Sequence, residues 1–192
     1  MSTNERILSP FTLPNGTELK NRLLMAPMTT CTGYYDGTVT SELVEYYRAR
    51  AGSIGTIIVE CCFVDDLGLA FPGAIGIDND EKIAGLAKIA DAIKSKGSKA
   101  LLQIYHGGRM VDPKLIGGRT PVGPSAVAAP RDGAATPVAL TSEEVEGMIG
   151  KFGEAVRRAI QAGFDGVEIH GANTYLIQQF YSPNSNQRDD EW

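Results

Sequence analysis

The segment GFDGVEIHGANTYLIQQFYSP, residues 163–183, contains the clearest strand signal of the sequence, with polar side chains directly after it. Gly163 predicts the left-handed turn that ends a helix. Residues 164–169 then predict a short buried strand, in which Val167 and Ile169 face one side and Glu168 faces the other. A helix that delivers the chain into a buried strand is typical of an α/β protein.

Three hydrogen-bonding side chains follow this predicted strand within six residues, namely His170, Asn173 and Tyr175. In α/β proteins, chemistry is placed at the carboxyl ends of the parallel strands. The sequence therefore predicts an active site directly after residue 169.

Strands and helices alternate along the rest of the chain. A hairpin is predicted over residues 11–19, because Asn15-Gly16 suits a tight turn that requires positive φ. Buried strands are predicted at 22–28, 55–60, 99–105 and 164–169. A first helix is predicted over 41–51. A second helix is predicted to begin at a capping box formed by Asp78 and Glu81, and a third at a capping box formed by Thr141 and Glu144. Long loops are expected at 29–39, 61–78 and 110–140.

This alternation indicates a parallel sheet with right-handed crossovers. A doubly wound sheet and a (β/α)₈ barrel both fit, but the glycine-rich dinucleotide fingerprint is missing after the first strand. Polar residues at the strand ends favour the barrel. The chain has 192 residues, whereas a whole barrel takes about 250. We therefore predict an α/β fold of the TIM-barrel type, with a single domain at 1–192 that contains about the first four βα units.

The composition limits the classes of partner and the cellular compartment that the chain can be expected to have. A formal net charge of −5 argues against nucleic acid or an anionic membrane surface. No run approaches the roughly 18 apolar residues that cross a bilayer, and MSTNERILSP does not resemble a secretory signal. The three cysteines, Cys31, Cys61 and Cys62, do not form a disulfide framework, which predicts a reducing cytoplasm. The cysteines and two histidines show no ligand spacing, so no metal site is predicted.

Four short motifs occur in order along the chain: PMT at 27–29, QIYHGGR at 103–109, HGANTYL at 170–176 and NQRDDEW at 186–192. Together they resemble the old yellow enzyme family, and the resemblance extends over the whole chain. These enzymes are FMN-dependent NAD(P)H:flavin oxidoreductases, or ene-reductases, built on a TIM barrel. The resemblance implies FMN as cofactor, NADH or NADPH as reductant, and an enone-like or enal-like small molecule as substrate.

The resemblance also implies a role for each site residue. The expected cofactor-binding residues are Ala26, Pro27, Met28, Thr29, Cys61, Gln103 and His170. Thr29 would bond near the flavin C4 carbonyl, and Gln103 would bond the pyrimidine edge of the ring. The expected catalytic and substrate-binding residues are His170 and Asn173, which would grip the substrate carbonyl, and Tyr175, which would donate a proton.

The chemistry explains why these residue types are needed. Hydride addition to the β carbon of an activated alkene leaves negative charge on the carbonyl oxygen. Two preplaced donors aimed at that oxygen stabilise the transition state by about 3 kcal/mol each. A phenol on the opposite side protonates the α carbon, and the cofactor carries the redox chemistry.

Several positions depart from the family pattern. Thr174 stands where glycine is usual, Tyr105 replaces a more common tryptophan, and Cys61 occupies a place that is often small. In the family, the chain usually continues beyond Trp192 with a second half. That half would supply an arginine at the flavin and the phosphate-binding loops after strands seven and eight.

Other readings remain open. A catalytically incomplete half-barrel could self-associate as a homo-oligomer, or recruit a missing half, through the open sheet edges 23–28 and 164–169. A phosphate-binding lyase or isomerase would need a lysine at a strand end, but Lys99 begins its strand. His106 could serve the site or only hold its loop, and Arg109 could contact flavin or pair with a loop carboxylate.

Overall fold

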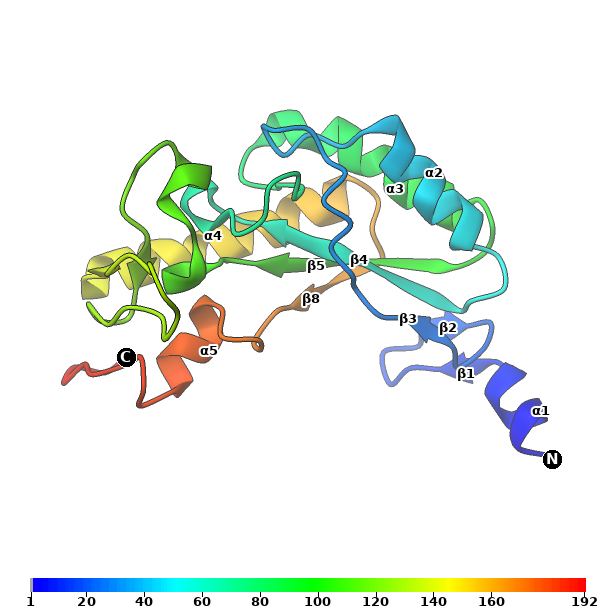
Figure 1. Cartoon of the computed structure of the whole chain (residues 1–192). Helices are drawn as coiled ribbons and strands as arrows, with labels where there is room; N and C mark the ends of the chain where they lie inside the picture. Colours follow the sequence, from blue (N-terminus) through cyan, green and yellow to red (C-terminus); the bar gives the residue numbers. More distant parts are fainter. Residues whose placement is uncertain (1) are drawn as a thin grey trace.

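A four-stranded parallel sheet forms the centre of the computed structural model, which describes residues 2–192 (Figure 1). The strands lie in chain order: β3 (Leu24–Met25), β4 (Thr56–Phe63), β5 (Lys99–Tyr105) and β8 (Gly166–Ile169). All three strand pairs are parallel. The sheet therefore follows the chain order that the alternating pattern predicted, with β3 and β8 at its two edges.

Three helices lie along one face of this sheet: α2 (Ser41–Arg50), α3 (Ile83–Lys94) and α4 (Ser142–Gln161) (Figure 1). The predicted hairpin is present as β1 (Phe11–Thr12) and β2 (Glu18–Leu19), which pair antiparallel. The hairpin and α1 (Thr3–Leu8) lie near one end of the sheet, and α5 (Leu176–Tyr181) follows β8 near the other end. The carboxyl ends of β4, β5 and β8 thus meet at the end that carries α5.

The core lies between the sheet and these helices. Alternate residues of β5, including Leu102 and Ile104, pack against Leu86 and Ile89 of α3, and all four are fully buried. Burying each such side chain contributes about 1.5–3 kcal/mol relative to exposure. The opposite side of β5 carries Gln103, so the same alternation that builds the core aims a polar side chain toward the site.

Strand β4 contains a bulge. Its register against β5 shifts between Val59 and Cys62. Ile57 and Val59 pack in the helix-facing core, as Cys62 does, whereas Cys61 joins a second cluster on the other side. Bulges recur next to active sites because they re-aim side chains. This one carries the strand beyond residue 60, where the sequence predicted its end.

The two edge strands differ from the prediction. The strand expected at 22–28 is reduced to Leu24–Met25, because Pro27 cannot donate to a ladder. The strand expected to be buried at 164–169 is shorter, and Ile169 is 58% exposed. Its outer side has no neighbouring strand within residues 2–192.

Helix starts were predicted with mixed success. The capping box of Thr141 and Glu144 is confirmed. The one expected from Asp78 and Glu81 is wrong. Asn79 instead caps the short 3₁₀ helix η2 (Asp80–Lys82) by accepting from the Glu81 amide at 3.1 Å, while Asp78 pairs with Lys82. Helix α1 was not predicted, although Ser2 and Glu5 form its capping box.

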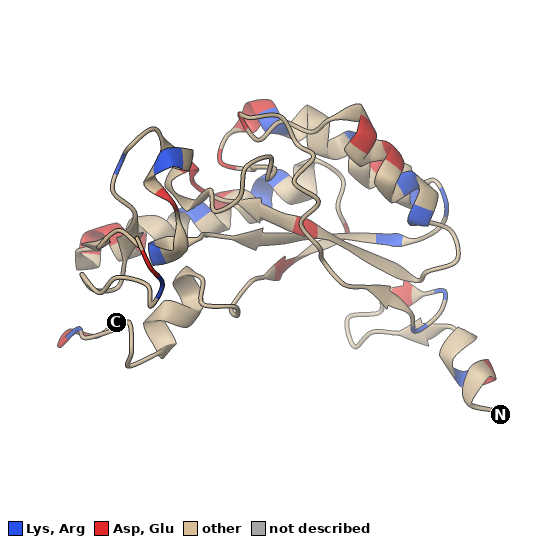
Figure 2. Cartoon of the chain, viewed as in Figure 1, with Lys and Arg blue, Asp and Glu red and all other residues tan. Residues whose placement is uncertain are grey.

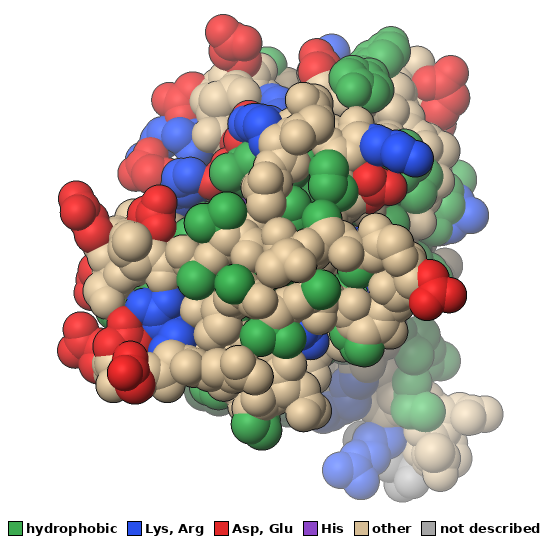
Figure 3. Space-filling view, turned by 60° about the vertical axis from the view of Figure 1, so that its left-hand side comes forward, with side chains coloured by type: hydrophobic (Ala, Val, Ile, Leu, Met, Phe, Trp, Pro, Cys, Tyr) green, Lys and Arg blue, Asp and Glu red, His purple; other side chains and the backbone are tan. Residues whose placement is uncertain are grey.

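The loops contain further short elements: η1 (Asp66–Gly68), η3 (Gly108–Met110), η4 (Pro113–Ile116), β6 (Val122–Gly123) and β7 (Val138–Ala139). Charged side chains lie mainly on the helices and loops, and few lie on the strands (Figure 2). On the face shown in Figure 3 they gather around the margin, and the centre is mostly uncharged. None of the helices in residues 2–192 has the length and apolar character needed to cross a membrane.

Candidate active site

Aromatic rings pack around the predicted proton donor at the carboxyl ends of β5 and β8. The ring of Tyr175 meets that of His170 edge-on, with centroids 4.9 Å apart and planes at 90°. Tyr105 lies 5.3 Å from Tyr175, and Phe71 lies 6.3 Å from it. The structure therefore brings together two of the three predicted catalytic side chains.

His170 is buried and held in one tautomer. Its Nδ1 accepts from the Ala172 amide at 3.3 Å, so the neutral ring carries its proton on Nε2. Burial lowers the pKa of His170, and the nearby Glu168 carboxylate partly opposes that effect. The imidazole is thus a neutral hydrogen-bond donor at pH 7.

Tyr175 keeps its proton at neutral pH. Burial, followed by a smaller effect of Cys61, raises the pKa of Tyr175 to about 12. A phenol that remains protonated and lies beside a neutral imidazole N–H is suited to proton donation.

The turn between these two residues has an unusual backbone. Asn173 and Thr174 have φ angles of 53° and 65°, in the left-handed region. Asparagine tolerates this region, whereas a β-branched threonine is strained there by about 1–3 kcal/mol. The Thr174 hydroxyl donates to the Asn173 carbonyl at 2.5 Å. The Asn173 side chain is exposed, so its expected role depends on the turn rather than on a packed contact.

Two predicted cofactor residues meet at the other end of the site. The Thr29 hydroxyl lies 3.0 Å from the Cys61 thiol, which the β4 bulge turns away from the helices. Burial raises the pKa of Cys61 to about 11, so the thiol is neutral. Ala26 and Met28 are exposed beside this pair, and Pro27 between them is half-buried.

Gln103 is paired with an acid that the sequence reasoning did not assign. Its Nε2 donates to Oε1 of Glu168 at 2.7 Å, across directly paired positions of β5 and β8. This leaves Oε1 of Gln103 as a free acceptor. The alternation of β8 placed Glu168 on the face opposite Val167, which was the signal for this contact.

A fully buried carboxylate lies under the Thr29 segment. Glu60 accepts from the Thr30 amide at 3.2 Å, from the Thr30 hydroxyl at 3.0 Å and from the Tyr47 hydroxyl at 3.2 Å. Burial raises the pKa of Glu60. The sequence signal was a lone acid at the end of an apolar run, and sequence reasoning gave it no role.

These residues fit the pyrimidine edge of a flavin, which offers an N–H donor between two carbonyl acceptors. The free Oε1 of Gln103 can accept and the Thr29 hydroxyl can donate. The single Nε2–H of His170 can donate either to this edge or to a substrate carbonyl. The apolar Ala26–Met28 segment can lie against a flat ring. Within residues 2–192, no group of three or more His, Cys, Asp or Glu side chains is placed to hold a metal ion.

His106 and Arg109 have local structural partners. His106 is 1% exposed, its Nδ1 accepts from the Gly108 amide at 3.0 Å, and burial lowers its pKa to about 3. The Arg109 guanidinium donates to backbone carbonyls, including those of Val127 at 3.2 Å and Asn184 at 3.3 Å. Of the two alternatives for Arg109, the pair with a loop carboxylate is not found within residues 2–192, where its guanidinium bonds to backbone carbonyls instead.

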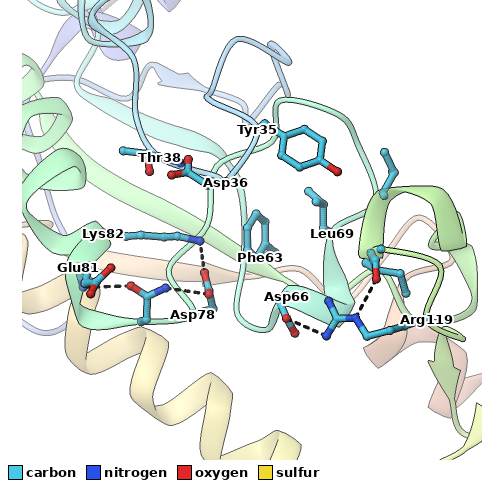
Figure 4. Close-up of a pocket in the computed structure, with 14 residues that line it drawn as sticks. Tyr35, Asp36, Thr38, Phe63, Asp66, Leu69, Asp78, Glu81, Lys82 and Arg119 are labelled. Atoms are coloured by element: carbon cyan, nitrogen blue, oxygen red, sulfur yellow. Dashed lines mark hydrogen bonds and ion pairs between the residues drawn. The ribbon is translucent and has the colours of Figure 1, made fainter.

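A pocket of about 490 Å³ lies beyond Phe63, outside the predicted site (Figure 4). Its cations are already paired, since Lys82 lies 2.5 Å from Asp78 and Arg119 lies 2.9 Å from Asp66. None of the predicted catalytic or cofactor-binding residues lines it. It offers no unpaired cation for an anionic ligand.

Solved structures of similar fold define the class. The old yellow enzyme homologue of Zymomonas mobilis matches with a TM-score of 0.88 at 35% identity, over 96% of this chain and 54% of that chain. Morphinone reductase matches with a TM-score of 0.87 at 31% identity, over 96% and 53%. The fold is thus that of flavin-dependent TIM-barrel oxidoreductases, which confirms the predicted fold class.

The chain belongs to the NADH:flavin oxidoreductase / NADH oxidase family, whose sequence model matches residues 6–192. This confirms the family resemblance, and FMN is the cofactor of that family. Morphinone reductase has also been solved in complex with tetrahydroNAD.

Curated relatives are longer than this chain. It is 88% identical over 192 residues to NADH:fumarate oxidoreductase of Klebsiella pneumoniae (strain 342), covering 100% of this chain and 21% of that protein. It is 59% identical to NADH:acrylate oxidoreductase of Vibrio harveyi, over 97% of this chain and 19% of that protein. It is 48% identical to a probable NADH-dependent flavin oxidoreductase of Bacillus subtilis (strain 168), over 97% of this chain and 50% of that protein. The chain therefore spans between about a fifth and a half of these relatives.

Proposed function

We propose that this chain forms part of an FMN-dependent oxidoreductase that uses NAD(P)H to reduce the activated C=C bond of α,β-unsaturated carbonyl compounds. The observation that carries this proposal is the edge-on contact of His170 and Tyr175, which pairs a neutral imidazole donor with a protonated phenol. The names of two relatives support the substrate class, because fumarate and acrylate are both alkenes conjugated to a carboxyl group. Those names also favour NADH over NADPH.

In this proposal each residue has a separate task. FMN, when bound, supplies the hydride. Gln103 accepts from the pyrimidine edge and Thr29 donates to it, while Ala26–Met28 and Cys61 line the ring. His170 and Asn173 hold the substrate carbonyl oxygen and stabilise its developing negative charge. Tyr175 holds the proton that goes to the α carbon.

The test combines flavin content with turnover. The whole oxidoreductase of which this chain is proposed to be part is purified, mixed with FMN, passed over gel filtration and examined by its absorbance spectrum. NADH and NADPH oxidation is then followed with fumarate, acrylate or a simple cyclic enone. We expect a yellow protein whose NADH oxidation depends on the alkene. A colourless protein that cannot be reconstituted with FMN would contradict the proposal.

A second candidate is a half-barrel that completes itself by association. The exposed apolar side chains at the two sheet edges favour it, since Leu24 on β3 is 55% exposed and Ile169 on β8 is 58% exposed. Two copies related by a two-fold axis would pair β8 of each with β3 of the other and bury both edges. Sedimentation equilibrium tests this candidate, and a monomer at micromolar concentration would exclude it. In either case, the free thiols of Cys61 and Cys62 suit a cytoplasmic location.

A further inference from the structure

Gln179 is a buried polar residue with no role in the chemistry described above. It lies on α5, is 1% exposed, and uses both ends of its amide. Nε2 donates to the Thr174 carbonyl at 2.6 Å and to the Gly107 carbonyl at 3.2 Å. Oε1 accepts from the Arg109 amide at 3.1 Å. One side chain thus joins the turn after β8 to the loop after β5.

Two further contacts support the same junction. The Leu176 amide donates to the His106 carbonyl at 2.9 Å, beside the Gln179 bonds. Gly108 has a φ of 59°, and a Cβ built on it would lie 2.2 Å from Oε1 of Gln179. The loop after β5 therefore approaches this amide as closely as a residue without a side chain allows.

We propose that Gln179 is the positioning residue of the carbonyl-binding turn. Thr174 is held at positive φ, a conformation that its own side chain disfavours, so an outside contact must stabilise it. The Nε2 bond to the Thr174 carbonyl supplies such a contact, beside the bond that the Thr174 amide donates to Oε1 of Gln178. The further bonds of Gln179 to Gly107 and Arg109 anchor the turn to the sheet through β5. Asn173 and Tyr175 flank Thr174, so the amide fixes both relative to the strand that carries Gln103.

Gln179 would hold the turn whether or not the chain binds flavin, and only its effect on turnover rests on the proposed function. A loosened turn would misplace Asn173 and Tyr175 relative to a bound carbonyl. The rate of alkene reduction would then fall more than the rate of flavin reduction by NADH, because only alkene reduction needs the turn.

Hydrogen–deuterium exchange of the full chain tests the positioning of the turn without flavin or substrate. In Gln179→Met, a residue of similar volume, the Thr174 carbonyl and the Arg109 amide lose their partner, while the Gly107 carbonyl keeps the Met110 amide as a donor at 3.2 Å. We expect exchange to rise by about tenfold at both Arg109 and the 174–176 turn, since an unsatisfied buried group costs more than one hydrogen bond contributes. Gln161→Met, an exposed change on α4, is the matched control and should alter neither segment. Faster exchange confined to α5 would show a merely local role and overturn the proposal.

Gln179→Glu is a gentler variant that adds a pH test. Its carboxylate can still accept from the Arg109 amide, but it repels the carbonyls of Gly107 and Thr174. Protonation restores one donor, so protection factors in the turn should recover toward wild type as the pH falls from 8 to 5. An equal loss at both pH values would overturn the proposal. If the whole oxidoreductase proves unable to bind FMN but both segments loosen together, the proposed function fails and the positioning role stands.

Discussion

The side-chain amide of Gln103 donates to the carboxylate of Glu168 at 2.7 Å, across directly paired positions of β5 and β8. An amide placed against a carboxylate must present its nitrogen to it, so its oxygen is directed elsewhere. Glu168 also raises the pKa of His170 against the effect of burial. One acid thus acts on both the expected cofactor-binding amide and the expected carbonyl-binding imidazole.

Glu168→Gln should weaken FMN binding by about tenfold, because a neutral amide no longer fixes the orientation of the Gln103 side chain and a charge-assisted bond is lost. It should also lower the pKa of His170 further, since the opposing carboxylate is gone. Flavin titration and NMR titration of the two histidines measure these effects separately. The exposed Glu146→Gln change on α4 is the control, and an unchanged His170 titration would contradict the assignment.

Thr174→Gly should stabilise the fold by about 1 kcal/mol. The strain of a β-branched residue at a φ of 65° is relieved, and the greater entropy of glycine in the unfolded chain offsets part of the gain. Thr174→Asn should give an intermediate value because asparagine tolerates this region. Urea unfolding provides the measurement. As a control, Thr12→Gly in strand β1 should instead be destabilising.

Tyr175→Phe should reduce alkene-dependent turnover by about 100-fold, because the variant lacks the proton donor while the ring packing against His170 is retained. NADH-driven reduction of the flavin, followed anaerobically by the loss of its visible absorbance, should change much less. A comparable loss in both half-reactions would show that the hydroxyl serves binding or folding rather than proton transfer.

His106 should make stability depend on pH. Its pKa of about 3 in the folded state lies below the ordinary value of 6.5, so below pH 6.5 the unfolded chain binds a proton that the folded chain does not. The free energy of unfolding therefore falls as the pH falls through this window. Between pH 7 and pH 5 the wild type should lose about 2 kcal/mol more than His106→Asn, in which the amide oxygen replaces Nδ1 as acceptor. Parallel losses in the two proteins would show that another group is responsible.

Local patterns predicted most of the fold. The hairpin at Asn15-Gly16, the helix after Thr141 and the strand containing Gln103 follow from turn chemistry, capping and alternation, which are encoded within a few residues. The edge strands were less predictable. How far β3 extends depends on which neighbour pairs with it, and the exposure of Ile169 depends on what lies beyond β8.

In the candidate site too, residues with local sequence signals were predicted, and contacts between distant segments were not. His170, Asn173 and Tyr175 were found because they are adjacent in sequence after one strand. Thr29 and Cys61 were expected near the flavin only through the family resemblance, and their contact with each other was not predicted. Gln179 gave no signal, because its partner Arg109 lies 70 residues away and its burial depends on packing between two loops.

The bulge in β4 has a consequence for how this strand tolerates changes in length. Residues 57 and 59 face the helices before it, and residues 62 and 64 face them after it, so Glu60 and Cys61 together stand where β5 has only Gln103. Removing a residue elsewhere in a regular strand would send the side chains on one side of the deletion to the wrong face. Deleting either Glu60 or Cys61 would instead restore a regular alternation and leave both faces in register. Deleting Glu60 would remove the carboxylate that holds Thr30 and Tyr47, whereas deleting Cys61 would remove the thiol beside Thr29. The strand thus tolerates a change of one residue in length only at the bulge, where each of the two residues holds part of the Thr29–Thr30 segment.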